Sequence, residues 1–540
     1  MGQIAYRANL SSATYPMTLS DGGRTVIMPG PDQNFDRRVD PQGEQKDAGI
    51  PQALYLENVM PTVNGYQSAG LWTPKEPMTT GGAMIGSVFE AKTLVSGIVE
   101  SISLFQRNDG VIVTGDRGTD VILIAGTLPS YPAIFSAAVV RGICYLYDAA
   151  SRRLYTLVNK APLELTEVTA SVTPLNFFTT NSILCIVGSS NYLVAISATT
   201  VYYSSTTTPL DFVSSLVSGA GETTPNDLNG RALWAKESQS GFYIYSNNNT
   251  VYAQYTGNAR YPWKFTAVRN SNGITDSSLV YLKGTQIFGE SDSEGHYVIE
   301  KGKQLKFIRG IEAIAVAPEA TEFLSKITVQ EIFDGATNTF SAASLTTQTS
   351  QIYLYLNRYV VVSINGTALL GFSGAIVYDT VLQRYGKLKL AYTHIFTSGA
   401  IDFSDSPTLC FFNRFTATIT AISFDIYLTS TTSYNLVEPN SVLVLGKFQY
   451  VRSRKIQLHE IEIEGAQNSA IIPAPNFSCV LLPSLDGRTF DAPVTPYQST
   501  FTGGLASYNC HTTAQNISLA IKGAFSVNTV QLKFSPRGDR

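Results

Sequence analysis

The chain has 540 residues, too many for a single hydrophobic core, so its length predicts two or three domains. Hydrophobic residues make up 44% of the chain, which excludes a disordered composition. Charged residues make up only 15%, against roughly 25% in an ordinary soluble domain. The net charge of -3 does not indicate a tight DNA binder, which usually has a basic domain or stripe.

Residues 1–80 are expected to form an irregular N-terminal arm with short strands that make assembly contacts. The segment 28–52 is dense in Pro, Gly, Asp and Gln, which are turn and loop residues. Within it, Arg37 and Arg38 lie among acidic residues. They either pair across a subunit boundary or lie in a solvated loop, and both interpretations stay open.

The following run, YLENVMPTVNGYQSAG, predicts a short strand, a turn at Asn64-Gly65 and another short extended piece.

Residues 81–430 are predicted to form a β-propeller-like body. Short β-branched and aromatic runs alternate with turns, as in GICYLYDAASRRLYTLV and GFYIYSNNNTVYAQY. GVIVTG with DVILIAG is expected to form another such strand–turn–strand unit. The units recur roughly every 40–60 residues, the spacing of four-stranded blades, which gives about five to seven blades. A stack of β-sandwiches is the alternative. One short helix is expected within 311–334, and a single helical turn within 209–219.

Residues 431–540 predict a separate β-sandwich-like C-terminal module. SVLVLGKFQYVRSRKIQLHEIEIEG predicts a pair of long strands, and SCVLLPSLDGRTF predicts a hairpin with its turn at Asp486-Gly487. The apolar alternation changes phase at His459-Glu460, which indicates a β-bulge. The expected fold class is therefore all-β, with this module added to the propeller-like body and the N-terminal arm.

The cysteines and the N-terminal residues bear on the cellular compartment. The five cysteines are odd in number and widely spaced, which favours buried free thiols and assembly in a reducing compartment. The first residues contain no apolar signal core, and no run of ~18 apolar residues is present. We therefore expect neither export by a signal peptide nor a membrane-spanning helix.

Motifs for chemistry are weak, so we expect no enzyme, no metal and no cofactor. The four histidines are scattered, and no nucleotide-binding loop or nucleophile elbow occurs. Glu460, Glu462 and Glu464 alternate along one strand and would share a face. Same-face residues two positions apart on a strand lie about 7 Å from each other, which falls within the roughly 5–10 Å that separates glycosidase carboxylates. A catalytic pair is therefore allowed, but we favour the interpretation that the row lies on a strand edge that faces solvent or another subunit.

A basic cluster precedes these carboxylates: Arg452, Arg454 and Lys455. Its side chains could touch phosphate in a DNA channel, or they could pair with the glutamate row within or between subunits. We favour the pairing. Seven strand-spaced aromatics are expected to pack between blades, with a carbohydrate platform as the alternative. They are Tyr202, Tyr203, Tyr243, Tyr245, Tyr252, Tyr255 and Trp263.

Several stretches resemble the tail nozzle, or tail tubular protein B-like, family of short-tailed (podovirus) bacteriophages. The resemblance rests on QALYLENVMPTVNGYQSAG, TVYYSSTTTPLDF, GAGETTPNDLNGRALWAKESQSGFYIYSNNNTVYAQYTGNARYPWKF, AIVYDTVLQRYGKL and QLKFSPRG. It covers most of the chain, although no single string is diagnostic and the chain is shorter than the largest nozzles.

The resemblance implies a propeller-bearing structural subunit of the virion tail, assembled in the host cytoplasm. Six copies would form a ring below the portal and adaptor, through which the double-stranded DNA genome is ejected. Expected partners are the adaptor or connector protein and tail fibres or spikes, without membrane insertion. The main rival is a tail-associated carbohydrate-binding or glycan-hydrolysing β-propeller. A β-rich surface adhesin is a second rival.

Overall fold

β-strands form nearly all the regular structure in the computed structural model, which confirms the all-β prediction. Its described residues are 4–9, 19–20, 23–24, 53–62, 65–74, 85–95, 98–114, 122–131, 133, 135–158, 163–238, 240–258, 260–274, 282–284, 295–300, 304–315, 329–334, 339–344, 352–356, 358–364, 371–382, 384–398, 408–416, 418–423, 434–436, 441–448, 455–467, 477–484, 497–499, 505–514, 516–523 and 525–536. Their only helical segments are η1 (Thr169–Ser171) and α1 (Phe177–Thr180). None of these residues belongs to a helix long and apolar enough to cross a membrane.

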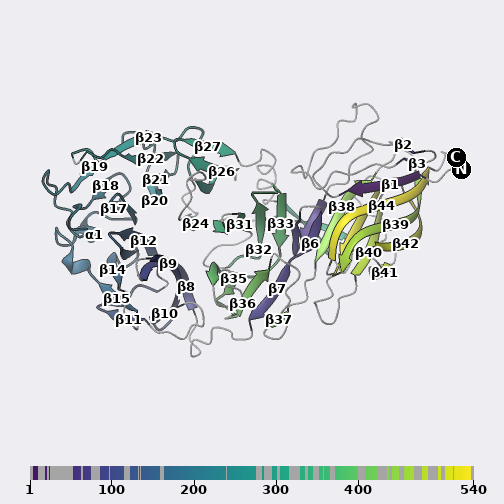
Figure 1. Cartoon of the computed structure of the whole chain (residues 1–540), viewed down its shortest axis with the longest axis horizontal. Helices are drawn as coiled ribbons and strands as arrows, with labels where there is room; N and C mark the ends of the chain where they lie inside the picture. Colours follow the sequence, from purple (N-terminus) through teal and green to yellow (C-terminus); the bar gives the residue numbers. More distant parts are fainter. Residues whose placement is uncertain are drawn as a thin grey trace.

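Seven sheets follow one another along the chain and form a ring (Figure 1). Ring sheet 1 contains β8 (Ile85–Val95), β9 (Ile98–Arg107) and β10 (Ile112–Thr114). Ring sheet 2 contains β11 (Leu123–Ala125), β12 (Phe135–Val140), β13 (Ile143–Asp148), β14 (Arg153–Val158) and β15 (Glu164–Glu167). Ring sheet 3 contains β16 (Cys185–Ser189), β17 (Tyr192–Ile196), β18 (Val201–Tyr203) and β19 (Gly221–Thr223). Ring sheet 4 contains β20 (Ala232–Ser238), β21 (Gly241–Ser246), β22 (Thr250–Tyr255) and β23 (Trp263–Ala267). Ring sheet 5 contains β25 (His296–Glu300), β26 (Gln304–Arg309) and β27 (Glu312–Ala315).

The last two ring sheets are completed by strands from the N-terminal region. Ring sheet 6 contains β24 (Leu282–Gly284), β30 (Ile352–Tyr355), β31 (Tyr359–Ile364), β32 (Gly374–Asp379), β33 (Arg384–Leu388) and β5 (Val59–Pro61). Ring sheet 7 contains β34 (His394–Ser398), β35 (Thr408–Asn413), β36 (Thr418–Ser423), β7 (Gly70–Pro74) and β37 (Tyr434–Leu436). A separate hairpin, β28 (Val329–Asp334) with β29 (Thr339–Ser344), lies between sheets 5 and 6 in sequence.

Apolar side chains join consecutive ring sheets. Buried clusters link sheets 1 to 5 in order and sheet 6 to sheet 7. Strand β25 of sheet 5 contacts β30 of sheet 6. Closure occurs between sheets 7 and 1, where the rings of Phe396 and Phe105 meet edge to face with centroids 5.0 Å apart. The described sheets therefore form a closed seven-sheet ring, as expected for a propeller.

Strands β12 and β16 approach each other so closely that glycine is needed between them. A Cβ on Gly188 would lie 2.5 Å from the carbonyl oxygen of Val139. Because real Cβ atoms do not approach backbone oxygens this closely, any side chain here would push the two sheets apart.

A two-sheet sandwich adjoins the ring (Figure 1). Its first sheet contains β1 (Ile4–Asn9), β6 (Tyr66–Ser68), β44 (Phe525–Pro536), β39 (Ile456–Gln467) and β42 (Leu505–Ala514). Its second sheet contains β4 (Ala53–Glu57), β38 (Val442–Phe448), β43 (Asn516–Lys522), β40 (Phe477–Ser484) and β41 (Tyr497–Ser499). A short hairpin, β2 (Leu19–Ser20) with β3 (Gly23–Arg24), comes between β1 and β4 in sequence.

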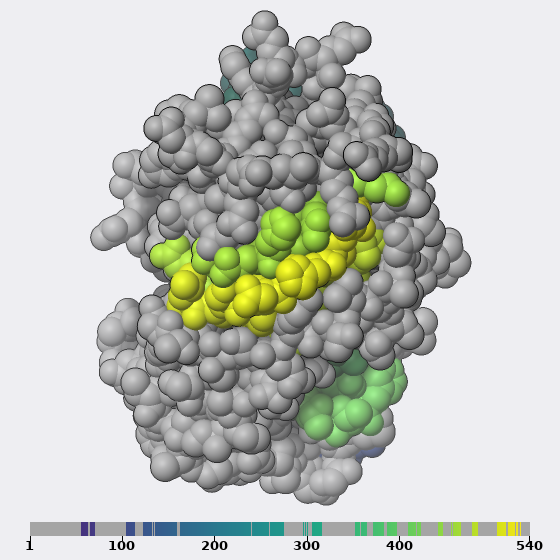
Figure 2. Space-filling view, turned by 90° about the vertical axis from the view of Figure 1, so that its right-hand side faces the viewer, coloured from purple at the N-terminus to yellow at the C-terminus, as the bar shows by residue number. Residues whose placement is uncertain are grey.

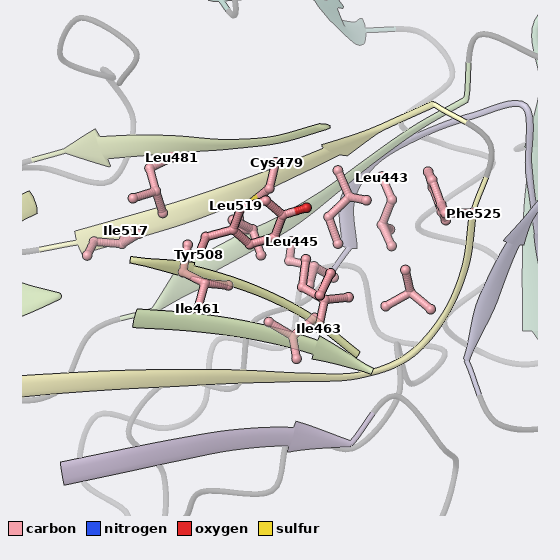
Figure 3. Close-up of a cluster of buried hydrophobic side chains, with 14 of the residues drawn as sticks. Leu443, Leu445, Ile461, Ile463, Cys479, Leu481, Tyr508, Ile517, Leu519 and Phe525 are labelled. Carbon is pink, nitrogen blue, oxygen red and sulfur yellow. The ribbon is translucent and has the colours of Figure 1, made fainter. Parts of the chain in front are cut away.

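The sandwich core lies between these two sheets, and Figure 3 shows its side chains meeting there. Leu443 and Leu445 of β38 belong to the same buried cluster as Ile461 and Ile463 of β39. The two long strands predicted here do not pair with each other. They lie in opposite sheets, because each faces the shared core across the sandwich.

Several local predictions are confirmed. The register of β39 shifts between Leu458 and Glu460 against both neighbouring strands, which is the predicted bulge. β5 and β6 form the predicted antiparallel hairpin before residue 70, with Thr62 N–H donating to the carbonyl of Gly65 at 2.9 Å. All five cysteines are buried and free.

The aromatic side chains that were expected to pack between blades are mostly buried in the clusters that join sheets 2, 3, 4 and 5, and Tyr255 is the most exposed of them.

Other local predictions are confirmed in part, are wrong or lie outside the described residues. β10 pairs with β9 and β11 pairs with β15, so GVIVTG and DVILIAG do not form one hairpin. The single helical turn expected within 209–219 is present, since Gly219 N–H donates to the carbonyl of Ser215 at 2.9 Å, whereas the described ends of 311–334 are strands. Residues 316–328 and the predicted turn at Asp486-Gly487 are not described. The domain boundaries at residues 80 and 430 stay predictions.

Candidate functional site

The predicted carboxylate row lies on the outer face of the sandwich. Glu460, Glu462 and Glu464 alternate with the fully buried Ile461 and Ile463, so the glutamates share the solvent side of β39. This face results from the bulge at residue 459, which shifts the phase of the alternation. The prediction of one shared face is confirmed.

Each glutamate sits between two neighbouring strands. Glu460 pairs with Asn509 of β42 and Lys533 of β44, and Ser507 Oγ donates to Glu460 Oε1 at 2.6 Å. Figure 2 shows β39 in green and β42 in yellow as adjoining strips at this end of the molecule. The row is therefore part of a polar sheet face that includes hydroxyl and amide side chains of β42.

Of the predicted basic residues, the structure describes one. Lys455 is exposed and immediately precedes β39. Arg452 and Arg454 lie outside the described residues, as do Arg37 and Arg38. Pairing of this basic cluster with the glutamate row stays a prediction.

A second candidate site is the junction between ring and sandwich. β33 of the ring pairs with β5, β5 pairs with β6, and β6 pairs with β44 of the sandwich. One hydrogen-bonded sheet therefore runs through both bodies. A continuous ladder resists bending at the join far better than a single-chain linker would, since backbone hydrogen bonds and packed neighbours hold it on both sides.

Polar groups hold this junction together, and Glu57, Asn58 and Ser441 among them are buried. Lys389 Nζ lies 3.0 Å from Glu57 Oε1, and Lys389 N–H donates to Asn58 Oδ1 at 2.8 Å. Asn58 has a left-handed backbone with φ of 53°, which asparagine tolerates better than most residues. The carbonyl of Asn58 accepts from Ser441 Oγ at 2.8 Å. Residues far apart in sequence thus meet at one backbone turn.

Ser68 makes the equivalent link on the sandwich side. Its hydroxyl donates to the carbonyl of Gly523 at 3.1 Å and accepts from Phe525 N–H at 2.9 Å. Gly523 N–H in turn donates to the carbonyl of Ser441 at 3.0 Å. Ser68 and Ser441 are almost completely buried, so each hydroxyl replaces lost water contacts with these bonds.

At the junction, Lys387 is a charged residue whose protonated form is disfavoured by burial. Its pKa is lowered from the ordinary 10.5 to about 8, and burial is the largest cause; Glu57 acts to raise the pKa and Lys389 to lower it. Because the folded pKa is below the unfolded one, the unfolded chain binds more protons between these values. The free energy of unfolding should therefore rise as pH increases from about 8 to about 10.5.

Replacing this lysine tests that charge. We expect Lys387→Met to raise the free energy of unfolding at pH 7 by up to about 3 kcal/mol, because a partly buried ammonium is removed. The gain should shrink towards pH 10.5. Urea unfolding from pH 7 to 10.5 measures the gain at pH 7 and its decrease at higher pH. Lys264→Met, at an exposed position of β23, is the control and should leave the profile unchanged. Parallel profiles for Lys387→Met and the wild type would contradict the assignment.

Sequence reasoning missed the junction. Glu57, Ser68, Lys389 and Ser441 carry no motif, and hundreds of residues separate the partners. The hairpin within YLENVMPTVNGYQSAG was the one local signal, and it does not reveal that its two strands pair with different bodies.

Within the described residues, no group of three or more His, Cys, Asp or Glu side chains is arranged to hold a metal ion.

Comparison with known proteins leaves the family open. No family model and no curated protein matches the chain. Among solved structures, the extracellular domain of a hybrid two component system from B. thetaiotaomicron matches with 10% identity and a TM-score of 0.35, over 86% of this chain and 59% of that one. A chain from the S. cerevisiae complex of Dbp5 with Nup159, Gle1, IP6 and ADP matches with 9% identity and a TM-score of 0.30, over 65% of this chain and 94% of that one.

Proposed function

We propose that the chain is a structural subunit of a short phage tail, forming a ring-shaped nozzle or hub below the portal and adaptor through which DNA is ejected. The observation that carries the proposal is the continuous sheet from the ring through β5 and β6 into the sandwich. A part that contains packaged DNA under pressure must transmit force without hinging, and this construction suits that task.

Two further features support a mechanical role. The ring closes on itself through buried aromatic contacts, so the series of sheets has no open end from which the sheets could separate one after another. The second is the sparsely charged composition, which suits close contact with neighbouring copies and weak contact with passing DNA. The role needs no cofactor and no catalytic residue.

The partners in this proposal are other copies of the chain, in a six-fold ring, the adaptor protein and the tail fibres or spikes. Cyclic assembly requires two different, complementary faces on each subunit. The lumen should be neutral to acidic, so that DNA phosphates find few cations to hold them. A continuous spiral of lumen-lining Lys or Arg would count against this.

Electron microscopy of the native particle, averaged along the tail axis, tests the proposal. We expect a ring of this chain around a central channel at the end of the tail. Separate peripheral copies, or no density for the chain in the tail, would overturn it. Release of reducing sugars from host envelope glycans, lost in Glu460→Gln or Glu462→Gln, would favour the glycan-hydrolysing rival instead.

A further inference from the structure

The outer edge of the sandwich is a long strand. β42 has ten residues and lies at the end of its sheet, where β39 is its one described partner. Its side chains alternate strictly between exposed and buried along the whole strand. Figure 2 shows it as a yellow strip at this end of the molecule. Ten residues span about 33 Å of edge, with one register shift against β39 opposite residues 509–512.

The sequence of this edge lacks two of the usual protections against pairing, which are charged side chains and proline. Soluble proteins block edge strands with Lys, Glu or Pro, or make them very short. The sequence LASYNCHTTA contains no Lys, Arg, Asp, Glu or Pro. Its exposed side chains include the hydroxyl of Ser507 and the amide of Asn509. Every second residue of an edge strand directs its backbone N–H and C=O outward, so β42 is a template for one more antiparallel strand.

On the other side of β44, β1 ends the sheet beside residues 529–534, whereas β6 continues it beside residues 526–527. Strand β1 pairs with β44 on the side away from β39, in register from Ile4 with Phe534 to Asn9 with Thr529. The two-residue strand β3 contacts β1 but is paired with β2. Each copy therefore presents two different edges of one sheet.

We propose that β42 of one copy pairs with β1 of the next copy, so that the sandwich sheets join around the ring. The inference rests on the proposed function, because it supplies the interface that a cyclic assembly needs. The four strands β1, β44, β39 and β42 alternate in direction. An even number of alternating strands leaves β1 and β42 antiparallel, so a neighbour rotated about an axis along the strands continues the alternation unbroken.

The register suggests where to place cysteines that report this contact. Glu462 pairs with Ser507 on one side and with Gln531 on the other, and Gln531 pairs with Arg7. Within one chain, positions 7 and 507 are therefore three strand spacings apart, about 14 Å. Disulfides need Cα atoms within about 7 Å, so a bond between these positions must join two copies.

The experiment uses assembled particles that carry the double variant Arg7→Cys/Ser507→Cys. After mild oxidation, a non-reducing gel should show a ladder of covalent oligomers that ends at the number of subunits in the ring. Partners Asn509→Cys and His511→Cys, each combined with Arg7→Cys, cover neighbouring registers. The five native cysteines are buried and should not contribute. Arg7→Cys/Thr418→Cys, with an exposed position in ring sheet 7, is the control and should give no ladder.

The outcomes separate this inference from the proposed function. Particles with a tail ring but no ladder from any of the three pairs would overturn the inference and leave the proposed function intact. A covalent dimer from Ser507→Cys alone would overturn it in favour of two-fold pairing between β42 strands. Particles without a ring of this chain would overturn both.

Discussion

Replacing Glu300 by alanine should lower the free energy of unfolding by about 3–5 kcal/mol, because it strands a buried ammonium group. The side chain of Glu300 is completely buried, and its Oε2 lies 2.8 Å from Nζ of Lys306, whose side chain is 7% exposed. Lys306 also donates to the carbonyl of Asn270. Without the carboxylate, Lys306 would keep its charge in a site with no compensating negative group among the described contacts.

Glu300 also joins two ring sheets. Its carboxylate accepts from Ser271 Oγ at 2.6 Å and from Asn272 N–H at 2.8 Å, in the segment that follows β23 of sheet 4. The alanine variant should therefore weaken the contact between sheets 4 and 5 as well as expose the lysine. Urea unfolding followed by tyrosine and tryptophan fluorescence measures the loss.

Two variants keep this prediction specific. Glu300→Gln retains one of the two acceptor oxygens used by Ser271 and Asn272 and removes the charge, so its effect should be intermediate. Glu312→Ala, at an exposed position of β27 in the same sheet, should change stability by less than about 0.5 kcal/mol. If Glu300→Ala and Glu312→Ala lowered the free energy of unfolding equally, the buried ion pair would contribute no more to stability than an exposed glutamate, which would contradict the prediction.

Asp148→Ala should cost about 3–4 kcal/mol, the second large effect we expect. Asp148 is fully buried at the end of β13. Its carboxylate accepts from the backbone N–H and hydroxyl of Ser130 at 2.8 and 2.9 Å, from Ala150 N–H at 3.1 Å and from the hydroxyl of Ser151. Hydrogen bonds to a charged acceptor contribute about 1.5–3 kcal/mol each, and their losses are not additive.

The matched control is Asn413→Ala, at the corresponding hairpin of ring sheet 7. Asn413 Oδ1 accepts from Phe415 N–H at 3.0 Å in a partly exposed turn, so its loss should cost only about 1 kcal/mol. Thermal or urea unfolding compares the two variants. A cost for Asp148→Ala no larger than for Asn413→Ala would contradict the anchoring role assigned to the carboxylate.

This turn chemistry recurs around the ring. At or just after the end of strands β13, β17, β21 and β35, a side-chain oxygen accepts from the backbone of the hairpin turn. The four residues are Asp148, Ser197, Ser246 and Asn413. The amino-acid sequence therefore contains the repeat, as an apolar strand followed by Asp, Ser or Asn. Sequence comparison alone missed it because three different residues perform the same hydrogen bonding.

The sequence by itself determined the all-β class, hairpins such as those of GICYLYDAASRRLYTLV and GFYIYSNNNTVYAQY, and the bulge at His459, because these depend on alternation and turn residues within a few positions. It also placed Glu460, Glu462 and Glu464 on one face, since the period of two is a local property. It did not determine that GVIVTG and DVILIAG belong to different sheets, because pairing partners are chosen by packing between distant segments.

Only the tertiary structure decided how the two bodies join. Val59 pairs with Lys387 and Tyr66 with Val527, contacts that cross hundreds of residues and follow from which strand edges are left open once the ring and sandwich have formed. No local pattern in residues 57–68 encodes that choice. The buried charge of Glu57 and the partly buried charge of Lys387 have the same origin, since a side chain's burial depends on the neighbours that the completed fold brings to it.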